Sequence, residues 1–241
     1  GNRTTPIVVS ICAAAGLTMP KTSSRAITSA SGTADVVETV TNVEFSTSEL
    51  KKIVEKTGAC LAWGGGLGLA PSDDKIISVE RLLKLDAEPQ LIASIMSKKI
   101  AAGSNYVLID IPCGATAKMK TKKSAQELAK KFKEVAKYFK IKLEVVITEG
   151  KQPIGNGFGP ILEMLDVVAV LSGRRPVPDL REKSLFLAAE IMKLCGLKES
   201  RKKAEYLLDS GKAYEKFKQI IAIQDEISRR VPEDFDEKLL K

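Results

Sequence analysis

The chain has 241 residues, of which 44% are hydrophobic, 28% charged and 5% aromatic, and its formal net charge is +8. This length excludes a disulfide-stapled miniprotein, and the composition is typical of an ordinary globular protein. No apolar run reaches the roughly 18 residues of a membrane-spanning helix. Histidine is absent, which excludes a histidine-ligated zinc site and a histidine-dependent catalytic triad.

The first elements are marked by proline and glycine. The apolar run over 6–15 begins at Pro6 and stops at Gly16, which predicts a short buried helix. A turn is expected at Met19 and Pro20. Residues 22–33 are small or hydroxylated with two exceptions, a composition that argues against a core strand or helix, and a helix is expected to start at Thr33.

Helices and strands then alternate along the chain. Ser46 and Glu49 form a capping box for a helix that ends at Gly58, and a buried strand over 59–63 follows. The other expected elements are a helix over 89–102, a strand over 106–111, a helix capped by Ser124 and Glu127 with Leu128, Phe132, Val135 and Phe139 inward, and a strand over 143–148. Three amphipathic helices, broken at Gly196 and Gly211, complete the chain from Leu180 onward.

This alternation predicts an α/β fold with a largely parallel sheet flanked by helices. Residues 71–104 read as helical without a strand, which indicates an excursion that belongs to a second, all-helical domain. The expected domains are therefore a first part of the α/β domain over 1–70, a helical segment over 71–104, and a second part over 105–241 that ends in helices. The opening Gly1 to Pro6 reads as a chain cut from something longer.

The segment over 22–33 is the first candidate site. Short hydroxyls and backbone N–H groups that lead into a helix suit a phosphate oxyanion, because a helix N-terminus presents unpaired donors. Arg25 can add a charge-assisted fork. A flexible serine-rich linker is the alternative, but the segment runs directly into the apolar residues Val36, Val37 and Val40, so an anion site is favoured.

Other candidate positions give weaker signals. The glycines over 155–159 suggest a dinucleotide loop, but their spacing fits poorly and a hinge is favoured. Ser94 and Lys98 are four apart and share a helix face. Lys118 follows a strand, where ligands of parallel sheets gather, and a substrate contact and a plain exposed lysine stay equally open. Asp86, taken alone, is interpreted as an ordinary helix cap.

Cysteine and lysine patterns indicate no metal and no nucleic acid. The four cysteines Cys12, Cys60, Cys113 and Cys195 are widely spaced and are interpreted as free thiols, mostly buried, of a cytosolic protein. The lysines over 122–137 lack interleaved aromatics and are read as a solvated helix face. A basic nucleic-acid-binding module, based on the net charge, is the non-catalytic alternative, and no membrane association is expected.

Four motifs together resemble the thymidine and pyrimidine nucleoside phosphorylase family, with the archaeal AMP phosphorylase branch as the nearest match. They are KTSSRAITSASGTADVVETV, GNRTTPIVVSICAAAGL, LDAEPQLIASIMSKK and DIPCGATAKMK, and the resemblance covers nearly the whole chain. It implies a cytoplasmic pentosyltransferase of nucleotide metabolism and AMP catabolism. Such an enzyme converts nucleoside 5′-monophosphates (AMP, with CMP or UMP as further substrates) to free base and ribose 1,5-bisphosphate. Inorganic phosphate is the co-substrate, no cofactor or metal is implied, and the full-length protein is expected to be a homo-oligomer.

The resemblance also implies roles for individual residues. Asp86 would protonate the leaving base, with a pKa raised by neighbours such as Leu83 and Leu85. The substrate-binding residues would be Ser24, Arg25, Ala26, Ile27, Thr28, Ser29, Thr33, Ser94 and Lys118, with Thr5, Ser23 and Lys98 as further substrate or phosphate contacts.

Two departures from the family pattern bear on the substrate and on activity. Val79 stands where the pyrimidine enzymes keep an arginine, which favours a nucleotide over thymidine, although Arg81 lies close by. The glycine-rich phosphate loop of the family would precede Gly1, so this chain alone is expected to lack part of the site. Thymidine phosphorylase is the alternative, followed by an anthranilate-type phosphoribosyltransferase, whose acidic metal-holding pair has only Asp35 as a candidate.

Overall fold

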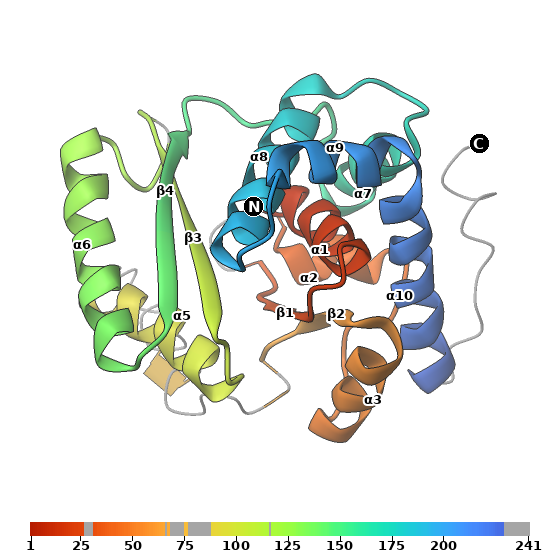
Figure 1. Cartoon of the computed structure of the whole chain (residues 1–241), viewed down its shortest axis with the longest axis horizontal. Coiled ribbons are helices and arrows are strands. Elements are labelled where there is room, and N and C mark those ends of the chain that lie inside the picture. Colours follow the sequence, from red (N-terminus) through yellow and green to blue (C-terminus); the bar gives the residue numbers. More distant parts are fainter. Residues whose placement is uncertain (27–30, 66, 68–74, 77–87, 116, 229–241) are drawn as a thin grey trace. The chain divides into compact units, whose positions relative to one another are not determined.

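The computed structural model describes residues 1–26, 31–65, 67, 75–76, 88–115 and 117–228. Its strands pair in parallel and are accompanied by many helices (Figure 1), which confirms the predicted α/β class. Contacts divide the chain into two compact units. Unit 1 comprises Gly1–Leu67, Ile154–Lys193 and Leu197–Lys241, and unit 2 comprises Gly68–Pro153 and Leu194–Gly196.

Unit 1 carries the N-terminal strand pair. Its elements are α1 (Thr4–Ala14), β1 (Met19–Ser23), α2 (Thr33–Glu38), α3 (Thr47–Thr57), β2 (Ala59–Trp63), α7 (Pro160–Ser172), α8 (Pro178–Leu194), α9 (Ser200–Asp209) and α10 (Lys212–Ser228). Strands β1 and β2 are parallel, in a register that runs from Met19 opposite Ala59 to Ser23 opposite Trp63. The last three helices confirm the predicted C-terminal helices, and Gly196 and Gly211 between them have φ of +86° and +77°.

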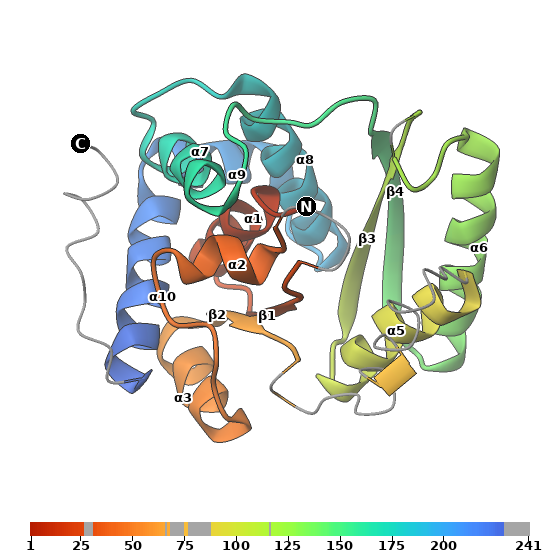
Figure 2. The same ribbon diagram turned by 180° about the vertical axis from the view of Figure 1, so that it is seen from behind.

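Helix α1 forms the centre of unit 1. Ile7, Val9 and Ile11 on this helix have no exposed surface, and α10 packs against it (Figures 1 and 2). The prediction of a short buried helix is confirmed, although the helix begins at Thr4, ahead of Pro6. Gly16 follows with a φ of +89°, a conformation that glycine adopts without a steric penalty.

Helix α3 forms where local signals agree. Ser46 Oγ accepts a hydrogen bond from Glu49 N, and the Glu49 carboxylate accepts one of 2.7 Å from Ser46 N. Gly58 ends the helix with a φ of +79°. The buried strand β2 follows at once over the predicted residues.

Strand β1 is an element that the sequence analysis missed. Met19 and Pro20 begin this strand, so the turn expected there is wrong, and its polar end at Thr22 and Ser23 belongs to the hydroxyl-rich segment. The strand is fixed by pairing with the apolar β2, with Pro20 opposite Cys60. Because that pairing is non-local, the composition of the segment itself gives no sign of it.

Unit 2 holds a second parallel strand pair. Its elements within the described residues are α5 (Glu88–Ala101), β3 (Tyr106–Cys113), α6 (Lys122–Tyr138) and β4 (Lys142–Glu149). They confirm the helices and strands predicted there. Ile92 and Met96 of α5 share a core with Val107 and Phe132. The lysines of α6 are exposed, as the interpretation of a solvated face requires.

Two details of α6 differ from the prediction. The N-cap is Thr121 and not Ser124, because the Thr121 hydroxyl accepts the hydrogen bond from Ser124 N at 3.1 Å. Phe139 was expected to point inward but is 47% exposed. The helix ends at Tyr138. The Phe139 ring lies edge to face with the Tyr138 ring, and the two ring centroids are 5.0 Å apart.

The division into two compact units reflects which elements pack around the same hydrophobic core. Residues 105–153, placed by sequence with the α/β domain, fall in the same unit as α5, because α5, β3 and α6 pack on one another. The domain limits at 1–70, 71–104 and 105–241 stay a prediction for the whole protein. Within the described residues, no helix is long and apolar enough to cross a membrane.

Candidate functional site

The hydroxyl-rich loop leaves the carboxyl end of the unit 1 strand pair. Ser23 and Trp63 are in register at this end, and Gly64 N donates a hydrogen bond of 2.9 Å to Ser23 O. The loop begins at Ser24 and leads into α2 at Thr33. Parallel sheets place their ligands beyond the carboxyl ends of strands, so the loop occupies the part of unit 1 where a binding site is expected.

The carboxylate of Asp35 closes this loop. Its Oδ2 accepts hydrogen bonds from Ala26 N and from Gly32 N, each 2.7 Å long. Ala34 N also donates to Ser24 O at 3.2 Å. A Cβ added to Gly32 would lie 2.3 Å from Ser24 O, so only glycine allows the two ends of the loop to touch.

Arg25 lies against carboxylates of this chain. Its guanidinium bonds both oxygens of Glu38, and it pairs with Glu44 at 2.8 Å and with Asp35 at 3.3 Å. It also lies over the Trp63 ring, 4.9 Å from the centroid. The hydrogen bond to Glu38 raises the pKa of Arg25 above its ordinary value. An anionic ligand would therefore have to replace one of these carboxylates to bind the guanidinium.

Hydroxyl groups near the loop bond to other parts of unit 1. Thr33 Oγ1 donates to Asn2 Oδ1 at 3.3 Å, and Asn2 Nδ2 donates to Ser31 O at 2.8 Å. Ser31 Oγ donates to Glu163 Oε1 of α7 at 3.0 Å. The end of the loop is thus tied to the start of the chain and to α7.

Unit 1 brings together most of the described members of the predicted substrate site. Ser23, Ser24, Arg25, Ala26 and Thr33 lie on the one loop and its two flanking elements. Ser23 Oγ accepts a hydrogen bond of 3.3 Å from Lys21 Nζ.

Thr5, a further predicted contact, lies on α1. Its Oγ1 donates to Gly1 O at 3.1 Å. Ile27, Thr28, Ser29 and the catalytic candidate Asp86 fall outside the described residues.

The remaining candidates lie in unit 2. Ser94 and Lys98 are half-buried on α5, and Lys118 is exposed in the loop between β3 and α6. Burial lowers the pKa of Lys99, and the neighbouring Lys98 charge lowers it further. The functional roles of these residues stay predictions.

A second loop of unit 1 is held by the buried carboxylate of Asp166. Its Oδ2 accepts hydrogen bonds from Asn156 N and Gly157 N at 2.7 and 2.8 Å. Asp166 Oδ2 also pairs with Arg3 at 3.3 Å, and Asp166 Oδ1 pairs with Arg175 at 2.9 Å. The backbone of the glycine segment over 155–159 is thus anchored at Asn156 and Gly157, and its role as a hinge stays a prediction.

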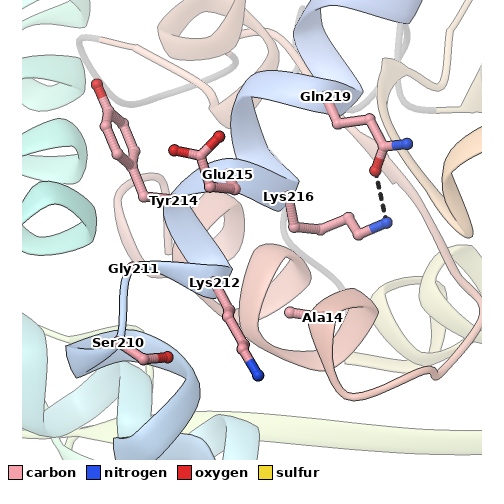
Figure 3. Close-up of a pocket in the computed structure, with 8 residues that line it drawn as sticks. All are labelled: Ala14, Ser210, Gly211, Lys212, Tyr214, Glu215, Lys216 and Gln219. Atoms are coloured by element: carbon pink, nitrogen blue, oxygen red, sulfur yellow. Dashed lines mark hydrogen bonds between the residues drawn. The ribbon is translucent and has the colours of Figure 1, made fainter.

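A cavity of about 500 Å³ lies elsewhere in unit 1 (Figure 3). It is lined by Ala14 at the end of α1 and by residues around the start of α10, among them Lys212 and Lys216. Lys216 Nζ donates to Gln219 Oε1 at 2.6 Å and to Thr57 O at 3.1 Å. None of the predicted site residues is among its lining residues.

Acidic groups of the described residues form no metal cluster of three or more members. Asp35, which the sequence analysis named only as a metal-ligand candidate, has a different role in the structure as the bridge across the loop. The signal that could have found it is its place three residues after Gly32, the position of a capping carboxylate.

The fold and the loop define an α/β domain with a hydroxyl-rich loop that leads into a helix. The family model described as "Glycosyl transferase family, a/b domain" matches residues 3–214. The chain belongs to this family.

Named relatives make the comparison more specific. The chain is 53% identical over 237 residues to an "AMP phosphorylase" of Pyrococcus abyssi, covering 97% of the chain and 47% of that relative. It is 52% identical over 236 residues to a "Putative thymidine phosphorylase" of Ralstonia nicotianae, covering 96% and 46%. The chain therefore spans about half the length of these relatives.

A solved structure shows the same fold. The anthranilate phosphoribosyltransferase of Thermus thermophilus matches with a TM-score of 0.69 and 17% identity, over 92% of this chain and 73% of that one. At this identity the likeness supports the fold and does not extend to the reaction.

Proposed function

We propose that the protein carrying this chain is a phosphorylase that transfers a pentosyl group from a nucleoside or nucleotide to inorganic phosphate. The observation that carries this proposal is the closed, hydroxyl-rich loop at the carboxyl end of β1, which leads directly into α2. Relatives about half identical to the chain carry phosphorylase names, which supports the same reaction class.

The specific substrate we propose is a nucleoside 5′-monophosphate, AMP first and CMP or UMP next. A phosphate oxygen forms a bond to C1′ while the bond from C1′ to the base breaks. The electron pair of that bond leaves with the base, which takes up a proton, and the sugar product is ribose 1,5-bisphosphate. Names of archaeal relatives such as that of Pyrococcus abyssi support this choice.

The proposed roles follow the predicted site. Asp86 supplies the proton, because a protonated carboxylic acid can act as the general acid for the leaving base. The loop residues hold the nucleotide and phosphate, and Ser94 and Lys118 hold the substrate, with Thr5, Ser23 and Lys98 as further contacts. We further propose that the reaction needs no cofactor and that the complete protein is a cytoplasmic homo-oligomer.

Thymidine phosphorolysis is the second candidate. It is favoured by the thymidine phosphorylase name of a relative that is 52% identical to the chain. Val79, in the position where the pyrimidine enzymes keep an arginine, weighs against it.

One assay tests the reaction and its substrate. The complete protein is incubated with phosphate and, separately, AMP, CMP, UMP or thymidine, and free base is measured, with phosphate omitted in the control. We expect phosphate-dependent adenine release from AMP. Thymine release without adenine release would establish the second candidate, and no base release at any phosphate concentration would refute both.

The acid assignment has its own test. Asp86→Asn removes the proton donor, so we expect kcat to fall by roughly 100-fold or more while substrate still binds, since general acids contribute about 10²–10⁴-fold. Retained turnover in this variant would show that another group protonates the base.

A further inference from the structure

We propose that Asp35 is a positioning residue that ties Ala26 to Gly32, next to the predicted substrate contacts Ser24, Arg25 and Thr33, an inference that rests on the proposed function. One oxygen of its carboxylate, Oδ2, receives the backbone N–H groups of Ala26 and Gly32, both at 2.7 Å. The other oxygen pairs with Arg25 at 3.3 Å. A single side chain therefore fixes both ends of the segment that carries the predicted substrate contacts.

These contacts exceed what a helix cap requires. Glu49 occupies the equivalent place in α3, and among the residues that the structure describes its carboxylate bonds only to Ser46, through N and Oγ, both at 2.7 Å. Asp35 makes the matching bond to Gly32 but also reaches Ala26, nine residues earlier in the chain. Capping explains the bond to Gly32, whereas the bond to Ala26 lies outside the capping pattern.

The charge around Asp35 supports a positioning role over direct binding of an anion. Two backbone donors of the loop are already bonded to its carboxylate, and a negative side chain at this place would repel phosphate. Arg25, which is shared with Glu38 and Glu44, compensates this charge. Asp35 thus acts through Ala26 and Arg25, and the loss of its charge-assisted bonds would release Ala26 and leave Arg25 held by Glu38 and Glu44 alone.

Trp63 provides an optical reporter for this loop. It is the only tryptophan of the 241 residues, and its ring lies 4.9 Å from the Arg25 guanidinium. A change in the position of Arg25 should therefore change the emission of Trp63 without any substrate present.

The test compares Asp35→Asn with the wild type and with Glu49→Gln, which removes a capping carboxylate of α3. Phosphorolysis kinetics are measured together with amide hydrogen exchange of the peptide over 24–34. We expect Asp35→Asn to raise the KM for phosphate and nucleotide about tenfold, the size of one charge-assisted hydrogen bond, while kcat changes less. Exchange of the loop amides should accelerate and Trp63 emission should shift, and Glu49→Gln should change none of these.

Unchanged KM values, or loop exchange as slow as in the wild type, would overturn the proposal. A merely structural role predicts a lower fraction of folded enzyme, which reduces apparent kcat and leaves KM as it was. If Asp35→Asn does not fold, Asp35→Glu replaces it, because this variant keeps the charge but displaces the carboxylate oxygens. It is judged by the same two measurements, the KM values and the exchange of the loop amides. If the wild type releases no base, the proposed function fails, and exchange and emission still decide whether Asp35 holds the loop.

Discussion

Two loops of unit 1 are held in the same way, by a single aspartate that accepts hydrogen bonds from backbone N–H groups and pairs with one or two arginines. Asp35 binds Ala26 N, Gly32 N and Arg25. Asp166 binds two adjacent N–H groups of the 155–159 segment and pairs with Arg3 and Arg175.

The two aspartates differ in burial. The Asp166 side chain has no exposed surface, whereas that of Asp35 is 22% exposed. Desolvation makes an unpaired buried charge expensive, so the contacts of Asp166 must all persist in the folded state. The partly exposed Asp35 can hold a loop that a ligand reaches. We infer that the buried aspartate serves the stability of the fold and that the partly exposed one serves the binding site.

The largest expected effect is on stability and comes from Asp166→Ala. This change leaves Arg3, whose side chain is 10% exposed, without its carboxylate, and we expect the free energy of unfolding to fall by about 3–5 kcal/mol. Urea denaturation followed by circular dichroism measures it.

Asp209→Ala is the control for Asp166→Ala. It breaks the exposed Arg181–Asp209 pair, in which Asp209 is 60% exposed, and should cost less than about 1 kcal/mol. Equal losses in the two variants would contradict the contrast in burial.

Gly32→Ala should have the next largest effect, through sterics alone. Its Cβ would lie 2.3 Å from Ser24 O and 2.5 Å from Arg25 C, and such overpacking costs about 1–3 kcal/mol. We expect lower stability together with altered Trp63 emission, because the backbone at Arg25 must move. Gly159→Ala meets nothing within 4 Å but has a φ of +93°, so it can lower the stability and should leave the emission unchanged. Wild-type emission in Gly32→Ala would refute the close contact.

Elements marked by neighbouring residues were predicted well, whereas a strand that depends on pairing with a distant segment was missed. The capping box of α3, its terminal Gly58 and the strand β2 lie within one short stretch, and each could be read from neighbours in sequence. Strand β1 depends on pairing with residues 40 positions away, such as Met19 with Ala59. Its proline and its hydroxyls therefore suggested a turn and a loop.

The candidate site was predictable as a segment but not in its contacts. Composition identified the hydroxyl-rich loop and the helix that follows it. It did not reveal that Arg25 lies against Glu38 and Glu44, or that Asp35 occupies two of the loop's amides. Those contacts depend on α2 lying beside Arg25 and Ala26, and pattern alone does not encode that arrangement.

Asp35→Asn tests the comparison on the stability side. It removes one partly exposed cap and bridge, so we expect the free energy of unfolding to fall by about 1 kcal/mol, well below the loss in Asp166→Ala. Denaturation of both variants under one set of conditions gives the two losses in free energy of unfolding, which can then be compared. A loss in Asp35→Asn as large as in Asp166→Ala would mean that the loop bridge is structural and that burial does not separate the two uses.

The smallest expected effect belongs to Glu49→Gln and depends on pH. Hydrogen bonds from the Ser46 side chain and backbone lower the pKa of Glu49 below its ordinary value of 4.5. A carboxyl group whose folded pKa is depressed stabilises the protein above its unfolded pKa, and this contribution is lost as the pH falls through the folded value. The wild type should therefore melt at a slightly higher temperature than Glu49→Gln at neutral pH, and the difference should vanish on acidification below 4.5. A difference that grows on acidification would mean that the charged carboxylate does not make these bonds, and Glu49 would then no longer serve as the purely local cap against which Asp35 is judged.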